Sequence, residues 1–195
     1  MADPLEERTA RLLADYLEYC ARPPGSPEPR PSSPEAAVLR STAARLRQRH
    51  ASFFSAFVDY PGSRVDLTAR MADAVLSGSR DLSWGRVVTL VTFAGTLLER
   101  GPLLPAGGQQ RGFRPRRKKE EGDVARDCQR LVALLSARLA GRHRAWLQAQ
   151  GGWDGFCVFF STPLPLTFWR RLPVQAFVSC LLAMAFIYFF WTRLL

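Results

Sequence analysis

The chain is poor in the side chains from which active sites and metal sites are usually built. Its 195 residues include four cysteines and two histidines. The cysteines form no CxxC pair, and neither His50 nor His143 has ligand-like neighbours, so no metal site is expected. GxSxG, HExxH, P-loop and GxGxxG motifs are all missing. We therefore predict that the protein is not an enzyme and uses no cofactor.

Lysine is also scarce, although the chain is strongly basic. The formal net charge is +10, and all but two of the 27 basic residues are arginine. Such a charge is common in nucleic-acid-binding proteins. Here the arginines are spread over every segment, and the dense run Arg114–Lys119, which contains the lysines Lys118 and Lys119, is followed at once by Glu120 and Glu121. We expect no nucleic-acid partner, and a net attraction to anionic lipid explains the charge better.

The N-terminus lacks the apolar segment of a secretory signal. Asp3, Glu6 and Glu7 lie where that segment would be. We therefore predict a cytosol-facing protein whose cysteines stay reduced.

Apolar periodicity predicts an all-α protein. Spacings of three and four residues predict amphipathic helices. The predicted ranges are 5–20, from Ser33 or Pro34 to just before Pro61, 65–76, 84–99, 123–141, and a short helix from Trp153 through Phe160 after the Gly151-Gly152 break. Between them, 21–34 is a proline-rich linker and 101–122 is a Gly/Pro-rich and then basic loop.

The stretch from Val87 to Leu98 contains no charge. It is too short to span a bilayer, which takes about 20 apolar residues, but it suits a helix enclosed by other helices. Arg86 would lie in its first turn, where the helix dipole disfavours a cation. An anion should therefore compensate Arg86, either inside the fold or on a partner.

The C-terminal stretch 172–192 is uncharged and is flanked by Arg170-Arg171 and Arg193. As a helix it would be about 31 Å long, against a hydrocarbon core of about 30 Å. A buried core helix is the alternative, but such a helix rarely lacks a polar stripe for six turns. We predict a helical domain over 1–165 and a transmembrane tail anchor over 166–195. The anchor residues are Leu172, Phe177, Leu181, Phe186, Tyr188 and Trp191.

Two tryptophan motifs resemble homology boxes of the Bcl-2 family. Trp84-Gly85-Arg86, followed by Phe93-Ala94-Gly95, resembles the first box, with Ser83 in place of the usual asparagine. The segment from Trp146 to Phe156 resembles the second box, and Tyr16–Tyr19 is similar to the fourth. The third box is read as Leu39, Ala43 and Ala44, and its aspartate is missing.

The resemblance implies a Bcl-2-like helical bundle around a central hydrophobic hairpin, 84–100 with 123–141. It also implies a surface groove that binds an amphipathic partner helix. By resemblance, Arg86 pairs with an aspartate of the partner and Gly85 allows close approach beside Trp84. The remaining groove residues are Leu46, His50, Phe54 and Phe57 on a wall, Val88 and Phe93 on the floor, and Phe160 at an end.

The family implies an apoptosis regulator, and we predict an anti-apoptotic one. It would bind the death-motif helices of pro-apoptotic relatives at the mitochondrial outer membrane or the endoplasmic reticulum. The missing aspartate at Ala44 argues against donation of the third-box helix. One alternative is a pro-apoptotic, membrane-permeabilising member, and another is a lipid-binding scaffold driven by the basic loop. A homo- or heterodimer within the family is a further implied partner.

Overall fold

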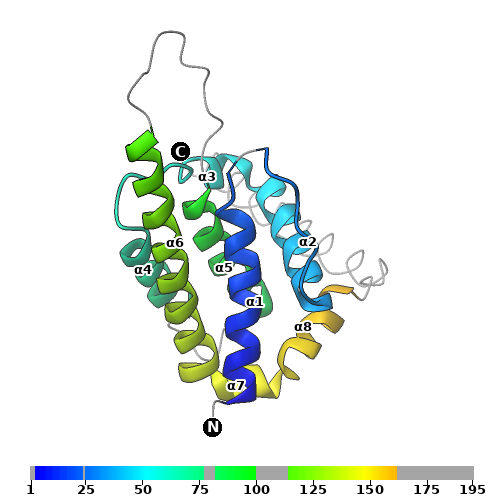
Figure 1. Cartoon of the computed structure of the whole chain (residues 1–195). Helices are drawn as coiled ribbons and strands as arrows, with labels where there is room; N and C mark the ends of the chain where they lie inside the picture. Colours follow the sequence, from blue (N-terminus) through cyan, green and yellow to red (C-terminus); the bar gives the residue numbers. More distant parts are fainter. Residues whose placement is uncertain (1–2, 24, 77–81, 100–113, 162–195) are drawn as a thin grey trace, which may run out of the picture. The chain divides into compact units, whose positions relative to one another are not determined.

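The computed structural model describes residues 3–23, 25–76, 82–99 and 114–161, with side chains for all of these except 114–121. Every regular element in this part of the chain is helical, so the all-α prediction is confirmed (Figure 1). The elements are α1 (Pro4–Cys20), α2 (Pro34–Arg49), α3 (Ala51–Ser55), α4 (Arg64–Leu76), α5 (Trp84–Leu98), α6 (Arg114–Ser136), the π-helix η1 (Ala137–Arg142), α7 (Arg144–Ala149) and α8 (Gly152–Ser161).

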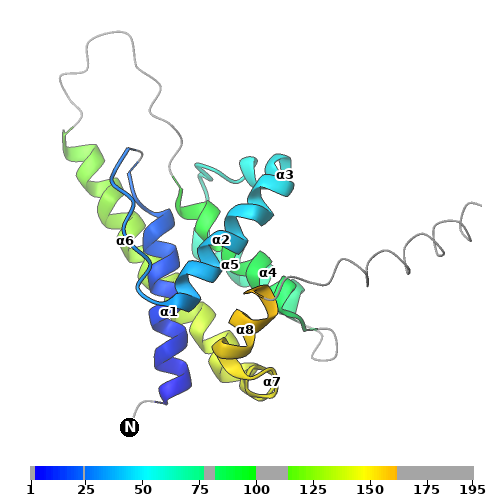
Figure 2. The ribbon, with the colours of Figure 1, turned by 90° about the vertical axis from the view of Figure 1, so that its right-hand side faces the viewer.

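Helix α5 is the centre of the bundle. It contacts α1, α2, α3, α4 and α6, which surround it in Figures 1 and 2. Every residue from Leu90 to Leu98 is buried, as the uncharged stretch predicts. Ser83 caps the helix, because its hydroxyl accepts a hydrogen bond from the Arg86 backbone N–H at 3.4 Å.

Helix α1 packs closely on α5 at Gly95. A Cβ atom at Gly95 would lie 2.8 Å from Cys20 Sγ and 2.8 Å from Tyr16 Cε1, so glycine allows the approach. Burial raises the pKa of the Cys20 thiol to about 12 and raises the pKa of the Tyr16 hydroxyl well above its ordinary value. Both side chains are therefore neutral at physiological pH and pack as part of the core.

The predicted single helix from 34 to 60 is wrong, because the chain breaks at His50. The backbone of His50 has φ −120° and ψ 40°, which lies outside the helical region. Helix α2 ends at Arg49, and the short α3 begins at Ala51.

The predicted basic loop is also wrong in its last part, because α6 already begins at Arg114. The residues from Arg114 to Glu121 are mostly Arg, Lys and Glu, which favour helix, and Pro115 lies in the first turn, where proline is tolerated. At its other end, the predicted helix 123–141 changes to the π-helix η1 after Ser136. There the His143 N–H donates to the Arg138 carbonyl at 3.0 Å.

Among the described residues, no helix is long and apolar enough to cross a membrane. The predicted anchor, 172–192, and the domain boundary at 165 lie outside the described residues. Both stay predictions.

Replacement of Gly95 by alanine should destabilise the fold. The new methyl group would overlap Cys20 and Tyr16, and overpacking of this kind costs about 1–3 kcal/mol. Gly122→Ala is the matched control, because a Cβ at Gly122 in α6 meets nothing within 4 Å and alanine favours helix by up to about 1 kcal/mol. Denaturant unfolding of the full-length variants measures both effects. Equal stability of Gly95→Ala and the natural chain would contradict the close packing of α1 on α5.

Candidate partner-binding site

An aromatic cluster of α7 and α8 side chains packs against Trp84, the first residue of α5. Trp84 is 3% exposed, and its ring centroid lies 4.9 Å from Trp146, 5.7 Å from Trp153 and 5.3 Å from Phe156. Trp153 Nε1 in turn donates to Thr9 Oγ1 at 2.8 Å, in the buried interior. The two tryptophan motifs, far apart in sequence, therefore meet in space. Trp84, predicted as a site residue, has almost no surface for a partner and acts by packing.

Gly85 and Arg86 directly follow Trp84 in the first turn of α5, and both are exposed. The Arg86 guanidinium forms no hydrogen bond or ion pair with any described residue. The compensating anion that Arg86 should have is therefore not supplied by the part of the fold that the structure describes. An exposed cation on a rigid helix end can pair with an anion from another molecule.

The predicted groove residues around α3 pack against one another. Phe54 is 3% exposed, Phe93 and Leu97 are fully buried, and Phe57 lies edge-on to Phe93 with 5.0 Å between ring centroids. Leu46 contacts the rim of this phenylalanine cluster. The structure thus brings these predicted residues together, in a closed arrangement.

The other predicted residues lie apart from the phenylalanine cluster. Val88 is 2% exposed and belongs to the main core. His50 is exposed at the break between α2 and α3. Phe160 is half-buried on α8 and packs on Phe156 at 5.0 Å between ring centroids. The predicted roles of these residues in partner binding stay predictions.

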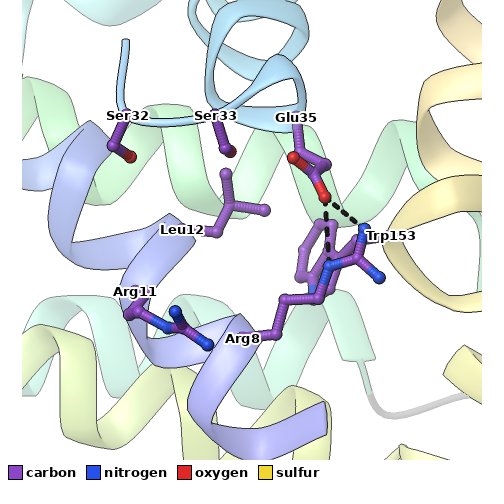
Figure 3. A pocket seen from close by; sticks show the side chains of 7 residues that line it. All are labelled: Arg8, Arg11, Leu12, Ser32, Ser33, Glu35 and Trp153. Carbon is purple, nitrogen blue, oxygen red and sulfur yellow. Dashed lines mark hydrogen bonds and ion pairs between the residues drawn. The ribbon is translucent and has the colours of Figure 1, made fainter. Parts of the chain in front are cut away.

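Arg8 joins three helices and was missed by the sequence analysis. Its guanidinium, on α1, bonds Glu35 of α2 and Asp154 of α8, with Nη1 2.9 Å from Asp154 Oδ2. Figure 3 shows Arg8 turned towards Glu35 in front of Trp153. These hydrogen bonds lower the pKa of both carboxyl groups. No local signal could have paired residues 146 positions apart in the sequence.

Two further arginines fasten the C-terminal end of α5. The Arg47 guanidinium, on α2, forms a two-pronged ion pair with Glu99, in which Nη2 lies 2.5 Å from Oε2. Arg64, on α4, donates from Nε to the Leu97 carbonyl at 2.8 Å and from Nη1 to Asp127 at 3.0 Å. Cations suit this end of a helix. Burial raises the pKa of the Glu99 carboxyl, and Arg47 opposes that rise.

Hollows lie beside the contacts of Arg8 and Arg47 on the described surface. One, of about 330 Å³, is lined by Arg8, Arg11, Leu12, Ser32, Ser33, Glu35 and Trp153 (Figure 3). Another, of about 390 Å³, is lined by Ala44, Arg47, Gln48, Ala51, Phe54, Ser55 and Val58. Only Phe54 among the predicted site residues lines either. In the described ranges no group of three or more His, Cys, Asp or Glu side chains could hold a metal ion.

Comparison with known proteins gives consistent matches. The profile of the family described as "Apoptosis regulator proteins, Bcl-2 family" matches residues 39–153. Human Bcl-2-like protein 10 is 74% identical over the whole chain, which covers 95% of that protein. The chicken anti-apoptotic protein NR13 is 37% identical over 82% of this chain and 80% of its own.

Solved structures agree with the fold. The solution structure of a divergent Bcl-2 protein has a TM-score of 0.66 and 49% identity, covering 84% of this chain and 94% of its own. The complex of the zebrafish pro-survival protein NRZ with Bad BH3 has a TM-score of 0.60 and 27% identity, covering 80% of this chain and 94% of its own.

The ion pair between Arg8 and Glu35 should make stability depend on pH in a defined direction. Because Arg8 lowers the pKa of Glu35 from its ordinary value of 4.5, the folded state binds fewer protons there than the unfolded state. The contribution is complete above the unfolded pKa and is lost as pH falls through the folded pKa. At pH 7 the free energy of unfolding of the natural chain should be about 1–3 kcal/mol larger than that of Glu35→Gln. This difference in stability should become smaller below pH about 4.5.

Unfolding of the full-length variants between neutral and acid pH tests this expectation. Glu7→Gln is the control, since Glu7 is exposed and lies 3.7 Å from Arg11, a contact worth at most about 0.5 kcal/mol. A stability gap for Glu35→Gln that persists unchanged in acid would contradict the assignment.

Proposed function

The chain belongs to the Bcl-2 family of apoptosis regulator proteins, and from this we propose that it is an anti-apoptotic member. It would bind amphipathic death-motif helices of pro-apoptotic relatives in a hydrophobic surface groove. Two similar proteins support an anti-apoptotic effect: NR13 is named anti-apoptotic, and NRZ is named pro-survival in its complex with Bad BH3.

The observation that carries the proposal is the exposed Gly85-Arg86 pair on a fixed helix end. Trp84 packs against three aromatic rings, and this packing holds the backbone of the first turn of α5 in place. The guanidinium has no partner among the described residues. A carboxylate on an incoming helix would supply the missing anion, and Gly85 would leave room for that helix to approach.

The apolar part of the groove would have to open for a partner. Phe54 and Phe93 are buried against each other by α3 in the isolated chain. Helix α3 has five residues and is bounded by the His50 break and by the turn that follows Ser55. Movement of this short segment would expose the phenylalanine cluster at less cost than a rearrangement of α5.

A pro-apoptotic, membrane-permeabilising role is the alternative. The third box argues against donation of its helix to another member, because Ala44 stands where the aspartate is expected. The similar proteins that are described by their effect, NR13 and NRZ, are anti-apoptotic or pro-survival. Neither observation favours the alternative, so binding and sequestration is the function we propose.

We place the protein on the cytosolic side of an intracellular membrane, as a tail-anchored protein of the mitochondrial outer membrane or the endoplasmic reticulum. The support is the uncharged stretch 172–192 between Arg171 and Arg193, whose length matches a bilayer. A groove held at a membrane would meet partners that use the same membrane.

Charge reversal at Arg86 should abolish binding of a partner helix without unfolding the protein. Truncating one side of a desolvated charge pair costs about 2–5 kcal/mol of binding free energy. The Kd should therefore rise roughly 30-fold or more. The fold should survive because the Arg86 side chain is exposed and forms no hydrogen bond or ion pair with a described residue. Titration of the full-length protein with a Bad BH3 peptide measures the change.

Arg11→Glu is the matched control, since it makes the same charge change on an exposed side chain of α1. It should leave the Kd within about two-fold, because surface charges away from an interface contribute little. Unchanged affinity of the Arg86→Glu variant would contradict the assignment of Arg86.

Deletion of residues 166–195 should release the protein from membranes. In contrast, neutralisation of the basic run should leave it bound, because a spanning helix outweighs a few surface charges. The neutralised side chains are Arg114, Arg116, Arg117, Lys118 and Lys119. Alkaline extraction of cell membranes followed by sedimentation compares the two variants. Release by neutralisation alone would instead favour the lipid-binding scaffold.

A further inference from the structure

Phe53 is unusual among the described residues, because it is a large apolar side chain that remains 44% exposed. Its ring is not isolated. It lies edge-on to Phe54 at 5.2 Å, tilted on Phe57 at 5.3 Å and tilted on Phe93 at 6.4 Å between centroids. Phe53 therefore forms the outer layer of the phenylalanine cluster, with one face on the cluster and the rest open to solvent.

The contacts of Phe53 reach across two elements. Phe53, Phe54 and Phe57 come from α3 and the turn that follows it, whereas Phe93 comes from the centre of α5. Phe53 and Phe54 are adjacent on α3 and point in different directions, so the burial of Phe54 leaves Phe53 nearer the surface. The sequence thus gives an aromatic residue to a position where core packing does not require one.

The surface around the cluster is cationic. Leu46 of α2 and Met71 of α4 pack against the cluster, and their neighbours Arg45 and Arg70 are exposed without an ion pair to any described residue, as is Arg49 at the end of α2. Of the five arginines from residue 44 to residue 72, Arg47 and Arg64 pair with Glu99 and Asp127. That leaves three exposed arginines without an ion pair to a described residue, against two aspartates, Asp59 and Asp66, in the same segment. An apolar ring within such a border complements a ligand that is apolar on one face and acidic on the other.

We propose that Phe53 is a specificity-determining residue of the partner groove. Its exposed ring face packs against one apolar side chain of an amphipathic helix whose polar face is acidic. The inference rests on the proposed function, and it adds a residue that the homology motifs do not include. Aromatic side chains are frequent anchors of interfaces because they bury a large area with few rotatable bonds.

The position of Phe53 also predicts how it distinguishes one partner helix from another. The Phe53 ring lies tilted against the Phe93 ring, with 6.4 Å between the centroids, on the outer side of the phenylalanine cluster. A partner helix that passes α3 meets a flat aromatic surface there, so the identity of one apolar partner residue matters strongly. Removal of the ring should weaken binding and also abolish the dependence on that one residue.

A double-mutant cycle on the full-length protein tests this contact. Bad BH3 peptides in which each apolar residue is replaced in turn by alanine are titrated into the natural chain and into Phe53→Ala. Phe53→Ala should weaken binding of the unmodified peptide about ten-fold. At one peptide position, replacement by alanine should weaken binding to the natural chain about ten-fold but binding to Phe53→Ala less than about two-fold. At the other peptide positions, alanine should weaken binding to both proteins by the same factor.

Val158→Ala is the matched control, because Val158 on α8 is an apolar side chain that is 65% exposed and is not among the predicted groove residues. It should bind the unmodified peptide as the natural chain does. Equal losses in the two variants would overturn the inference, since binding would then follow exposed apolar area in general. Tighter or faster binding by Phe53→Ala would overturn it too, because Phe53 would then only cover the groove.

The failure of the inference is distinguishable from the failure of the proposed function. If the natural chain does not bind the peptide at all, the proposed groove is wrong and the role of Phe53 falls with it. If the natural chain binds and Phe53→Ala binds equally well, the groove stands and only the role of Phe53 is wrong. Thermal unfolding of both variants checks that they are folded.

Discussion

The burial of α5 is the constraint on which the other helices depend. From Leu90 to Leu98 no residue of this helix reaches solvent, and a cylinder that is apolar all round must be covered all round. Helices α1, α2, α3, α4 and α6 therefore pack along it, and α7 and α8 supply the aromatic rings around Trp84. Charged residues occur only at the ends of the buried part of α5, with Arg86 near its N-terminus and Glu99 after its C-terminus. These two borders are also where the candidate site and the arginine contacts lie.

Arginine does structural work in this protein that lysine could not do equally well. Arg8, Arg47 and Arg64 each join helices that are distant in sequence. Arg40 of α2 belongs to the same class, since its Nη2 lies 2.7 Å from Asp15 of α1 and the two side chains are 10% and 9% exposed. A planar guanidinium can bond several oxygens at fixed angles, whereas an ammonium group acts as a point charge. The carboxylate partners cancel the charge of these arginines, so packing of the bundle explains why arginine is preferred to lysine there and does not explain the net charge.

Helices with a clear apolar stripe and clear ends were predictable. The predicted ranges 5–20, 65–76 and 84–99 agree closely with α1, α4 and α5, because proline, a capping serine and the apolar period are local signals. The break at His50 was not predictable, since the spacing of three and four residues continues through it in the sequence. Only the structure shows that Phe53 of α3 and Phe57 after it pack on Phe93 of α5. The start of α6 was missed for the opposite reason: a basic run reads as solvated loop although its residues favour helix.

The sequence by itself determined the all-α class, the buried central helix and the two tryptophan motifs, because periodicity, absence of charge and motif spacing are written along the chain. Only the tertiary structure decided which motif residues face solvent. It buried Trp84, Val88 and Phe93, left Gly85 and Arg86 exposed, and placed Phe53 on the surface of the phenylalanine cluster. The physical reason is that exposure depends on which helices cover a given face, and that cover comes from segments far away in the sequence.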